Sequence, residues 1–212
     1  MAEKRLRVSI VGCGPGSAEF VTPLAEAKVR EAETLVGPRR LLDLFPYSTA
    51  MRIEVGHEIA QAIEAVKAQY RDGRRVTVLV TGDPGLASFA QPLLRALGRE
   101  NCEVIAGVSS VQVAFARTGL SWEDAVIINA HGRDTVFDPG DLKSSGKVVI
   151  LAGGACQEKA LTAFLEEARR SHRVFVMENL ALSNERVLDY CGPESLHLAQ
   201  PTIILIVRRD LL

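Results

Sequence analysis

The sequence has little of what marks several common protein classes. Only 5% of its 212 residues are aromatic, and its four cysteines lie far apart with no C-x-x-C pair. This spacing disfavours a disulfide framework or a cysteine zinc site and predicts reduced thiols in a cytoplasmic protein. The net charge of −1 provides no basic field, which disfavours nucleic acid as the main partner.

Other absences argue against further classes of protein and kinds of site. No apolar run approaches the length of a membrane span, and the first residues lead straight into a strand without the apolar core of a signal peptide. The phosphate-cradling pattern G-x-x-x-x-G-K-[ST] does not occur. Four scattered histidines show no metal-ligand spacing, so no metal site is predicted.

What the sequence does contain is typical of helices packed on a sheet. It is 47% hydrophobic, mostly Val, Leu, Ile and Ala. Helical segments are expected at 23–31, 41–44, 59–70, 86–97 and 111–118. Strands in the first half are expected at Leu6–Val11, Thr34–Val36, Val76–Val80, Glu103–Ala106 and Ala125–Asn129. This alternation predicts an α/β fold with a mostly parallel sheet and helices on both of its faces.

The second half predicts a smaller α/β unit with some antiparallel pairing. Residues 138–146 are polar and rich in Gly, Pro and Ser, so we interpret them as a linker between a domain of residues 1–137 and a domain of residues 147–212. A helix is expected at 157–170. Further strands are expected at Val148–Leu151, Val174–Met177, Arg186–Tyr190 and Thr202–Val207.

Three strands of the first half end in loops of small residues. The loops are Gly12-Cys13-Gly14-Pro15-Gly16, Thr81-Gly82-Asp83-Pro84-Gly85 and Gly107-Val108-Ser109-Ser110. Open α/β sheets bind ligands outside the carboxyl ends of their strands, so these loops predict a crevice that binds a small molecule through backbone groups. Taken singly, Asp83 is equally well explained as a turn former, and Ser109 and Ser110 as helix caps.

The first of these loops does not match a dinucleotide-binding fingerprint. The third glycine position of G-x-G-x-x-G is Ser17, and the second strand ends in Val36-Gly37 without the acid that would bind a ribose. Pro15 also removes an amide donor. A tight turn between strand and helix is therefore favoured over a dinucleotide site.

Two further strand ends carry polar side chains. His131 and Arg133 flank Gly132 just after the strand Ala125–Asn129, an arrangement suited to an anion or acid–base site. Glu178-Asn179, after the strand Val174–Met177, is a weaker candidate of the same kind.

The order and spacing of the motifs resemble the tetrapyrrole methylases, a family of S-adenosylmethionine-dependent methyltransferases. The matching stretches are V-G-C-G-P-G near the start, T-G-D-P-G in the middle and A-G-V-S-S after the following strand. In addition, G-P-R-R-L-L at 37–42 and N-A-H-G-R-D at 129–134 are similar to the branch that methylates ring carbon 5 of cobalamin precursors, of the cobalt-precorrin-7 or precorrin-6Y type.

The resemblance implies two α/β domains with the methyl donor in the cleft between them, often in a homodimer. Methylation and decarboxylation at carbon 15 would then belong to a separate polypeptide. The residues implied for donor binding are Thr81, Gly82, Asp83, Leu86, Ser88, Ser109, Ser110 and Leu151. Those implied for the tetrapyrrole are Gly14, Pro15, Arg39, Arg40 and Arg133, with His131 as the base that takes the displaced proton.

Other functions stay open at this point. One is a related methylase acting on another ring position, on RNA or on a protein. Another is an NAD(P)-dependent reductase of the same pathway, although the missing ribose acid argues against it. The last is a binding module that sequesters a tetrapyrrole without turnover.

Overall fold

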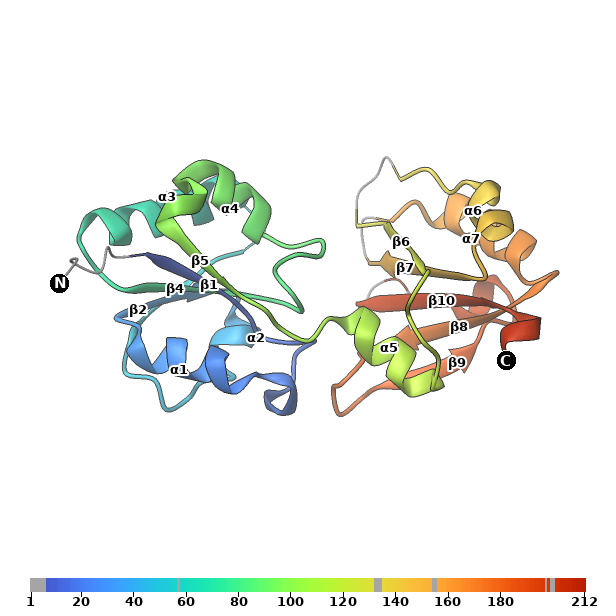
Figure 1. The fold of residues 1–212 in the computed structure, drawn as a ribbon, viewed down its shortest axis with the longest axis horizontal. Helices are drawn as coiled ribbons and strands as arrows, with labels where there is room; N and C mark the ends of the chain where they lie inside the picture. Colours follow the sequence, from blue (N-terminus) through green and yellow to red (C-terminus); the bar gives the residue numbers. More distant parts are fainter. Residues whose placement is uncertain (1–6, 57, 132–134, 154–155, 197, 199–200) are drawn as a thin grey trace. The chain divides into compact units, whose positions relative to one another are not determined.

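The computed structural model describes residues 7–56, 58–131, 135–153, 156–196, 198 and 201–212. The chain divides into two compact units, Met1–Ser109 and Ser110–Leu212, which are called unit 1 and unit 2 below. Each unit contains one five-stranded sheet with helices packed on it (Figure 1).

The sheet of unit 1 is parallel throughout. Its strands are β1 (Val8–Gly12), β2 (Thr34–Gly37), β3 (Met51–Glu54), β4 (Val76–Val80) and β5 (Cys102–Ile105). They lie in the order β3-β2-β4-β1-β5, and every pair is parallel. The predicted parallel α/β sheet is therefore confirmed. The strand β3 was not predicted, although Met51 and Ile53 alternate with Arg52 and Glu54, and only one of its four side chains is even half-buried.

Helices cover both faces of this sheet, as predicted. They are α1 (Pro23–Glu31), α2 (Arg39–Leu42), α3 (Ile59–Arg71) and α4 (Ala90–Leu97). Successive strand residues point to opposite faces. Ile10 and Val78 pack with residues of α3 and α4, whereas Val11 and Leu79 pack with residues of α1 and α2. Figure 1 shows α3 and α4 above the sheet and α1 and α2 below it.

Helix α1 begins where the sequence predicts. The side chain of Thr22 accepts a hydrogen bond from the amide of Ala25 at 3.1 Å, and Pro23 takes the first helical position, where its missing N–H costs nothing. Helix α4 instead begins at Ala90, four residues later than expected. The residues in between stay in a loop, where Ala87 has the left-handed φ of 46°.

Unit 2 has a mixed sheet, as predicted. Its strands are β6 (Val126–Asn129), β7 (Lys147–Ala152), β8 (His172–Glu178), β9 (Arg186–Asp189) and β10 (Thr202–Arg208), in the order β6-β7-β10-β8-β9. Strands β6 and β7 are parallel, and β10 runs antiparallel to both β7 and β8. The carboxyl ends of β6, β7 and β8 therefore lie at one edge of the sheet, together with the start of β10.

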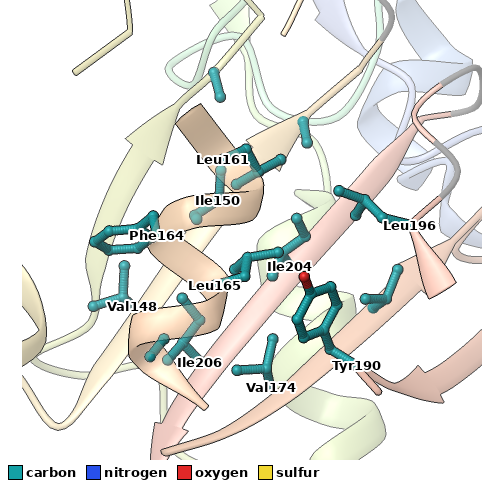
Figure 2. Packing of buried hydrophobic residues seen from close by; sticks show 14 of the residues in the cluster. Val148, Ile150, Leu161, Phe164, Leu165, Val174, Tyr190, Leu196, Ile204 and Ile206 are labelled. Carbon is teal, nitrogen blue, oxygen red and sulfur yellow. The ribbon is translucent and has the colours of Figure 1, made fainter. Parts of the chain in front are cut away.

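One face of this sheet packs on α6 (Pro139–Ser144) and α7 (Glu158–Ala168), and α5 (Ser110–Thr118) contacts β10 on the other face (Figure 1). The core beneath α7 is built from apolar side chains together with the ring of Tyr190. Figure 2 labels its members Val148, Ile150, Leu161, Phe164, Leu165, Val174, Tyr190, Leu196, Ile204 and Ile206. Short 3-10 helices lie at Ala18–Phe20, Arg99–Asn101, Pro193–Ser195 and Arg209–Leu211.

The boundary between the units differs from the predicted one. Strand β6 pairs with β7, so it belongs to unit 2 and not to the first half of the chain. The residues expected to form a linker carry α6 instead, because Asp138 caps the amide of Gly140 at 2.8 Å and Pro139 begins the helix. The polar composition of residues 138–146 thus reflects an exposed, capped helix.

Two further structural features concern membrane-spanning helices and the cysteines. No helix within the described residues is long and apolar enough to cross a membrane. All four cysteines are free, and Cys13 and Cys102 are buried.

Candidate functional site

Three loops meet at the carboxyl edge of the unit 1 sheet. The β1 loop is Gly12–Gly16, the β4 loop is Thr81–Ser88, and the β5 loop is Ala106–Ser109. Strands β1 and β4 are neighbours, yet the helices that follow them, α1 and α4, pack on opposite faces of the sheet. This arrangement is a topological switch point, the place where open α/β sheets bind their ligands.

The β1 and β4 loops are joined through their backbones. The amide of Cys13 donates to the carbonyl of Val80 at 2.9 Å, and the amide of Gly82 donates to the carbonyl of Gly14 at 2.7 Å. Both Gly14 and Gly82 have left-handed φ values, +72° and +67°, which favour glycine. The glycines of these two motifs therefore fix a backbone contact between the loops.

The β5 loop fits against the other two so closely that only glycine is tolerated. A Cβ atom placed on Gly12 would lie 2.6 Å from the carbonyl oxygen of Gly82 and 2.7 Å from the amide nitrogen of Gly107. Both obstacles are backbone atoms, which cannot rotate away as a flexible side chain does. The predicted convergence of the three loops is therefore present in unit 1, and it depends on bare backbone.

Asp83 ties the β4 loop to the β5 loop. Its Oδ1 accepts a hydrogen bond from the amide of Gly85 at 2.7 Å, and its Oδ2 accepts one from the amide of Gly107 at 3.1 Å. The carboxylate thus forms the local turn and also reaches a loop 24 residues away in sequence. Its visible role is to position backbone groups at this edge.

The remaining unit 1 residues expected to bind the donor lie in the same two loops. Leu86 is half-buried and donates its amide to the carbonyl of Asp83 at 3.1 Å. Ser88 is half-buried, and its hydroxyl accepts a hydrogen bond from the amide of Ala90 at 2.9 Å at the start of α4. Ser109 is buried, with its Cα 3.9 Å from where a Cβ on Gly82 would stand.

The two arginines of α2 point to different partners. Nη2 of Arg40 donates to Oγ1 of Thr81 at 2.8 Å, which brings the guanidinium to the β4 loop. Partial burial lowers the pKa of Arg40 below its ordinary value. Arg39 instead has a side chain that is 78% exposed, and it pairs with Asp43 at 3.9 Å. The structure therefore brings Arg40, and not Arg39, to the loops.

Cys13 is the thiol of the β1 loop, and the sequence analysis gave it no role. Its side chain is fully buried and donates to the carbonyl of Val11 at 3.6 Å. Burial raises the pKa of Cys13 to about 12, so the thiol is neutral near pH 7.

The other predicted site residues belong to unit 2. Ser110 is the first residue of α5. Leu151 is buried near the end of β7, in register with Asn129 of β6. Arg133 lies outside the described residues, as do its neighbours 132 and 134.

His131 stands just beyond β6, at the same sheet edge as the end of β7. Its amide donates to Oδ1 of Asn129 at 3.2 Å, and its Nδ1 lies 3.3 Å from where a Cβ on Gly153 would be. The residue as a whole is exposed, yet the ring beside Gly153 is partly desolvated, and this lowers the pKa of His131. The imidazole is therefore neutral near pH 7 and can accept a proton.

A buried carboxylate lies at this edge too, and the sequence indicated it only weakly. The Glu178 side chain is 4% exposed, with Oε2 3.3 Å from Nη1 of Arg186, while Oε1 has no hydrogen-bond partner within the described part of the chain. Its position at a strand end was noted from the sequence, but its burial was not. In the same part of the chain, no cluster of three or more His, Cys, Asp or Glu residues could hold a metal ion.

The family to which these features belong is decided by comparison with known sequences. The profile of "Tetrapyrrole (Corrin/Porphyrin) Methylases" matches residues 7–190, which is most of the chain. The chain belongs to the tetrapyrrole methylase family. It is thus an S-adenosylmethionine-dependent C-methyltransferase of tetrapyrroles in cobalamin biosynthesis. Both the resemblance inferred from the motifs and the expected fold are confirmed.

Individual tetrapyrrole methylases resemble the chain over nearly its full length. The cobalt-precorrin-7 C(5)-methyltransferase of Salmonella typhimurium is 30% identical, over 85% of this chain and 88% of that protein. The crystal structure of a precorrin-6Y methylase from Archaeoglobus fulgidus is 25% identical, with a TM-score of 0.72, over 96% and 98% of the two chains. A uroporphyrin-III C-methyl transferase from Thermus thermophilus, complexed with S-adenosylhomocysteine, is 21% identical with a TM-score of 0.72, over 95% and 92%.

Proposed function

We propose that this tetrapyrrole methylase transfers a methyl group to ring carbon 5 of a macrocycle of the cobalt-precorrin-7 or precorrin-6Y type. The cobalt-precorrin-7 C(5)-methyltransferase of Salmonella typhimurium supports the ring position, and the precorrin-6Y methylase of Archaeoglobus fulgidus supports the class of macrocycle. The observation that carries the chemistry is the backbone contact among the three loops at the switch point of unit 1.

The loops of unit 1 suit a methyl donor with a polar nucleoside part. Bare amides and carbonyls at a strand edge can hydrogen-bond ribose and adenine without long side chains that would have to be ordered first. We propose that Thr81, Gly82, Asp83, Leu86, Ser88 and Ser109 hold the donor, with contributions from Ser110 and Leu151 of unit 2. In this arrangement Asp83 acts by fixing the amides of Gly85 and Gly107.

The bound donor supplies an electrophilic methyl group on a sulfonium, which is already a good leaving group. The protein therefore needs no covalent nucleophile. It has to hold the attacking carbon in line with the methyl and exclude water, and such orientation can lower a barrier by roughly 7–11 kcal/mol. The new bond joins carbon 5 to the methyl carbon as the bond from methyl to sulfur breaks, and the proton displaced from carbon 5 goes to a base.

We propose His131 as that base. Its ring is neutral near pH 7, because desolvation lowers its pKa, and a neutral imidazole accepts a proton. The His131→Gln variant should lower kcat by roughly a hundredfold and leave the affinity for the methyl donor unchanged. Single-turnover rates with saturating donor would measure this, and an unchanged rate would remove His131 from the mechanism.

The carboxylates of the macrocycle need cationic side chains to bind them. Gly14 and Pro15 of the β1 loop would face the ring. Of the predicted arginines we retain Arg40, because Arg39 pairs with Asp43 in solvent, and we retain Arg133 on the motif alone. Charge-assisted hydrogen bonds to carboxylates are the expected contacts.

Mass spectrometry tests the reaction as a whole. The protein is incubated with the isotopically methyl-labelled donor and a pool of cobalamin intermediates, and the products are fragmented to locate the label. A label at carbon 5 is the expected result. A label at another carbon would contradict the ring position but not the family, and the absence of any labelled macrocycle would contradict the proposal altogether.

We also propose that the protein acts as a homodimer and that a separate polypeptide methylates and decarboxylates at carbon 15. Light scattering during size-exclusion chromatography would measure the mass in solution. A monomer at micromolar concentration would contradict the dimer. A product already methylated at carbon 15 would contradict the division of labour.

A further inference from the structure

Asn179 is a buried polar residue that has no role in the reaction described so far. It directly follows β8 at the carboxyl edge of the unit 2 sheet, and only 7% of it is exposed. Within the described residues its carboxamide forms no hydrogen bond, although its backbone amide and carbonyl both do. A carboxamide has two N–H donors and an acceptor oxygen, and leaving them buried without partners is costly. Asn179 is therefore a candidate for contact with a ligand.

The turn after β8 holds Asn179 in an unusual backbone conformation. Its φ of +51° is left-handed, which asparagine tolerates better than most residues. Its amide donates to the carbonyl of Pro201 at 3.1 Å, and its carbonyl accepts from the amide of Leu182 at 2.9 Å. Ala181 is left-handed too, with a φ of +65°, and its amide donates to Oε2 of Glu185 at 2.6 Å. Left-handed residues other than glycine cluster at ligand sites, where the surrounding structure holds them in place.

A row of apolar residues crosses the sheet beside this turn. Leu151 of β7 is in register with Ile203 of β10, which is in register with Met177 of β8, and all three side chains are buried. The alternate residues of these strands pack under α7, so the row lies on the face that α5 contacts. Leu151 is one of the residues proposed for the methyl donor. It lies two strands from β8, about 10 Å, a span that a purine and its ribose can bridge.

The charges around the turn disfavour a carboxylate as the ligand. Arg117 already binds Glu185 through two hydrogen bonds, and Arg186 lies 3.3 Å from Glu178. A carboxylate of the macrocycle would meet neither arginine as a free cation, and a neutral carboxamide binds it more weakly than a cation does. The carboxamide instead offers an N–H donor beside an acceptor oxygen. The 6-amino group and N7 of adenine are the complementary pair, and asparagine binds that edge through two hydrogen bonds.

We propose that Asn179 determines specificity for the adenine of the methyl donor. Its Oδ1 accepts a hydrogen bond from the 6-amino group, and its Nδ2 donates one to N7. This role rests on the proposed function, since Asn179 then serves the donor of that reaction. Methyl transfer to carbon 5 does not depend on it, so either assignment can fail without the other.

Calorimetry with S-adenosylhomocysteine and its 7-deaza analogue, which has carbon in place of N7, tests the contact. Wild type should bind the analogue roughly fivefold to tenfold more weakly, the value of one hydrogen bond. Asn179→Gly keeps the left-handed backbone but lacks the carboxamide. It should bind S-adenosylhomocysteine roughly tenfold to a hundredfold more weakly than wild type and should not distinguish the two ligands. The matched control Asn184→Gly removes an exposed carboxamide from the same loop and should leave both affinities within about twofold.

Asn179→Asp should reverse the preference of wild type. It keeps the size of the side chain and its tolerance of the left-handed backbone, but it places an oxygen where Nδ2 would donate to N7. Affinity for S-adenosylhomocysteine should fall by at least roughly tenfold, and the 7-deaza analogue should now be the tighter ligand. S-inosylhomocysteine, with an oxygen in place of the 6-amino group, should bind wild type at least roughly tenfold more weakly, and this difference should shrink in Asn179→Gly.

Urea unfolding without ligand distinguishes this role from a merely structural one. Because glycine and aspartate both tolerate the left-handed backbone, neither variant should shift the unfolding midpoint appreciably. A shifted midpoint with unchanged ligand discrimination would show that Asn179 serves only the turn.

Two other outcomes would also overturn the assignment. Unchanged affinity for S-adenosylhomocysteine in Asn179→Gly, together with a raised KM for the tetrapyrrole, would place the carboxamide on the macrocycle. Equal losses in Asn179→Gly and Asn184→Gly would show a general loosening of the loop. The proposed function fails separately, if wild type transfers no methyl group to carbon 5 of a tetrapyrrole.

Discussion

The tripeptide Asp-Pro-Gly occurs once in each unit, at 83–85 and at 138–140. In both places the aspartate Oδ1 accepts a hydrogen bond from the glycine amide two residues on, at 2.7 Å and 2.8 Å. Only Asp83 also reaches a distant loop, through Oδ2 to the amide of Gly107. The same residues thus form the same local turn, but only the first turn joins two strand ends. A local motif sets a local conformation, and the sheet around it decides whether that conformation builds a site.

The largest effect should come from adding a side chain at Gly107, whose amide is the distant hydrogen-bond partner of Asp83. A Cβ on Gly107 would meet the carbonyl of Gly82 and would lie 2.7 Å from the carbonyl oxygen of Gly12. Gly107→Ala should therefore cost about 3 kcal/mol of unfolding free energy and abolish binding of S-adenosylhomocysteine. Urea denaturation and calorimetry would measure the two quantities.

The matched control is Gly140→Ala, in the second tripeptide. There a Cβ would lie 3.0 Å from Oδ1 of Asp138, a side-chain atom that can shift. Its unfolding free energy should stay within about 1 kcal/mol of wild type, with donor affinity unchanged. Similar losses in the two alanine variants would refute the close three-loop contact.

Removing the two aspartates should give a smaller but more selective effect. Asp83→Ala leaves two amides without their acceptor, so it should cost about 2 kcal/mol and weaken S-adenosylhomocysteine binding by at least roughly tenfold. Asp138→Ala removes only a helix cap and should cost about 1 kcal/mol with no change in donor affinity. If calorimetry gave both variants wild-type affinity, Asp83 would be merely a turn former.

The smallest expected effect is a loss of folding stability at low pH, and it comes from His172 of unit 2. His172 is buried at the start of β8, with its Nδ1 2.9 Å from the hydroxyl of Ser171, and burial lowers the pKa of His172. The unfolded chain, with an imidazole pKa of about 6.5, then binds the proton more readily than the folded chain does. The contribution of His172 is full above that pH and is lost as the pH falls through the lower pKa of the folded state.

Unfolding in urea between about pH 7.5 and about pH 5.5 would measure this loss. The His172→Gln variant should show a shallower fall in stability than wild type, with His131→Gln as the control for the other histidine whose pKa is lowered. A fall as steep in His172→Gln as in wild type would contradict the argument.

Much of the fold could be predicted because the sequence patterns that mark its strands and helices are local. Strand β4 occupies the expected residues, since its four apolar side chains and Thr77 are all buried and a glycine turn follows them. Helix α1 was predicted from a cap and a proline that act within one turn. The same cap and proline stand at Asp138-Pro139, but the polar composition around them favoured a linker, and that interpretation was wrong.

Some features of the candidate site could be predicted from the sequence as well, and others could not. The meeting of the three glycine loops could be predicted, because parallel strands bring their carboxyl ends to one edge. The contact between Arg40 and Thr81 could not, since it joins residues 41 positions apart and depends on how α2 packs. The burial of Glu178 was equally hidden, because it depends on the neighbours that β10 and β9 bring to either side of β8.

The burial of Cys13 has a consequence for an enzyme that handles a reactive sulfonium. Thiolates are strong nucleophiles, and one exposed near a methyl donor would consume it by alkylating itself. With its pKa raised to about 12, Cys13 holds its proton and stays inert. Keeping this sulfur under the sheet edge would protect both the protein and its co-substrate from a wasteful side reaction.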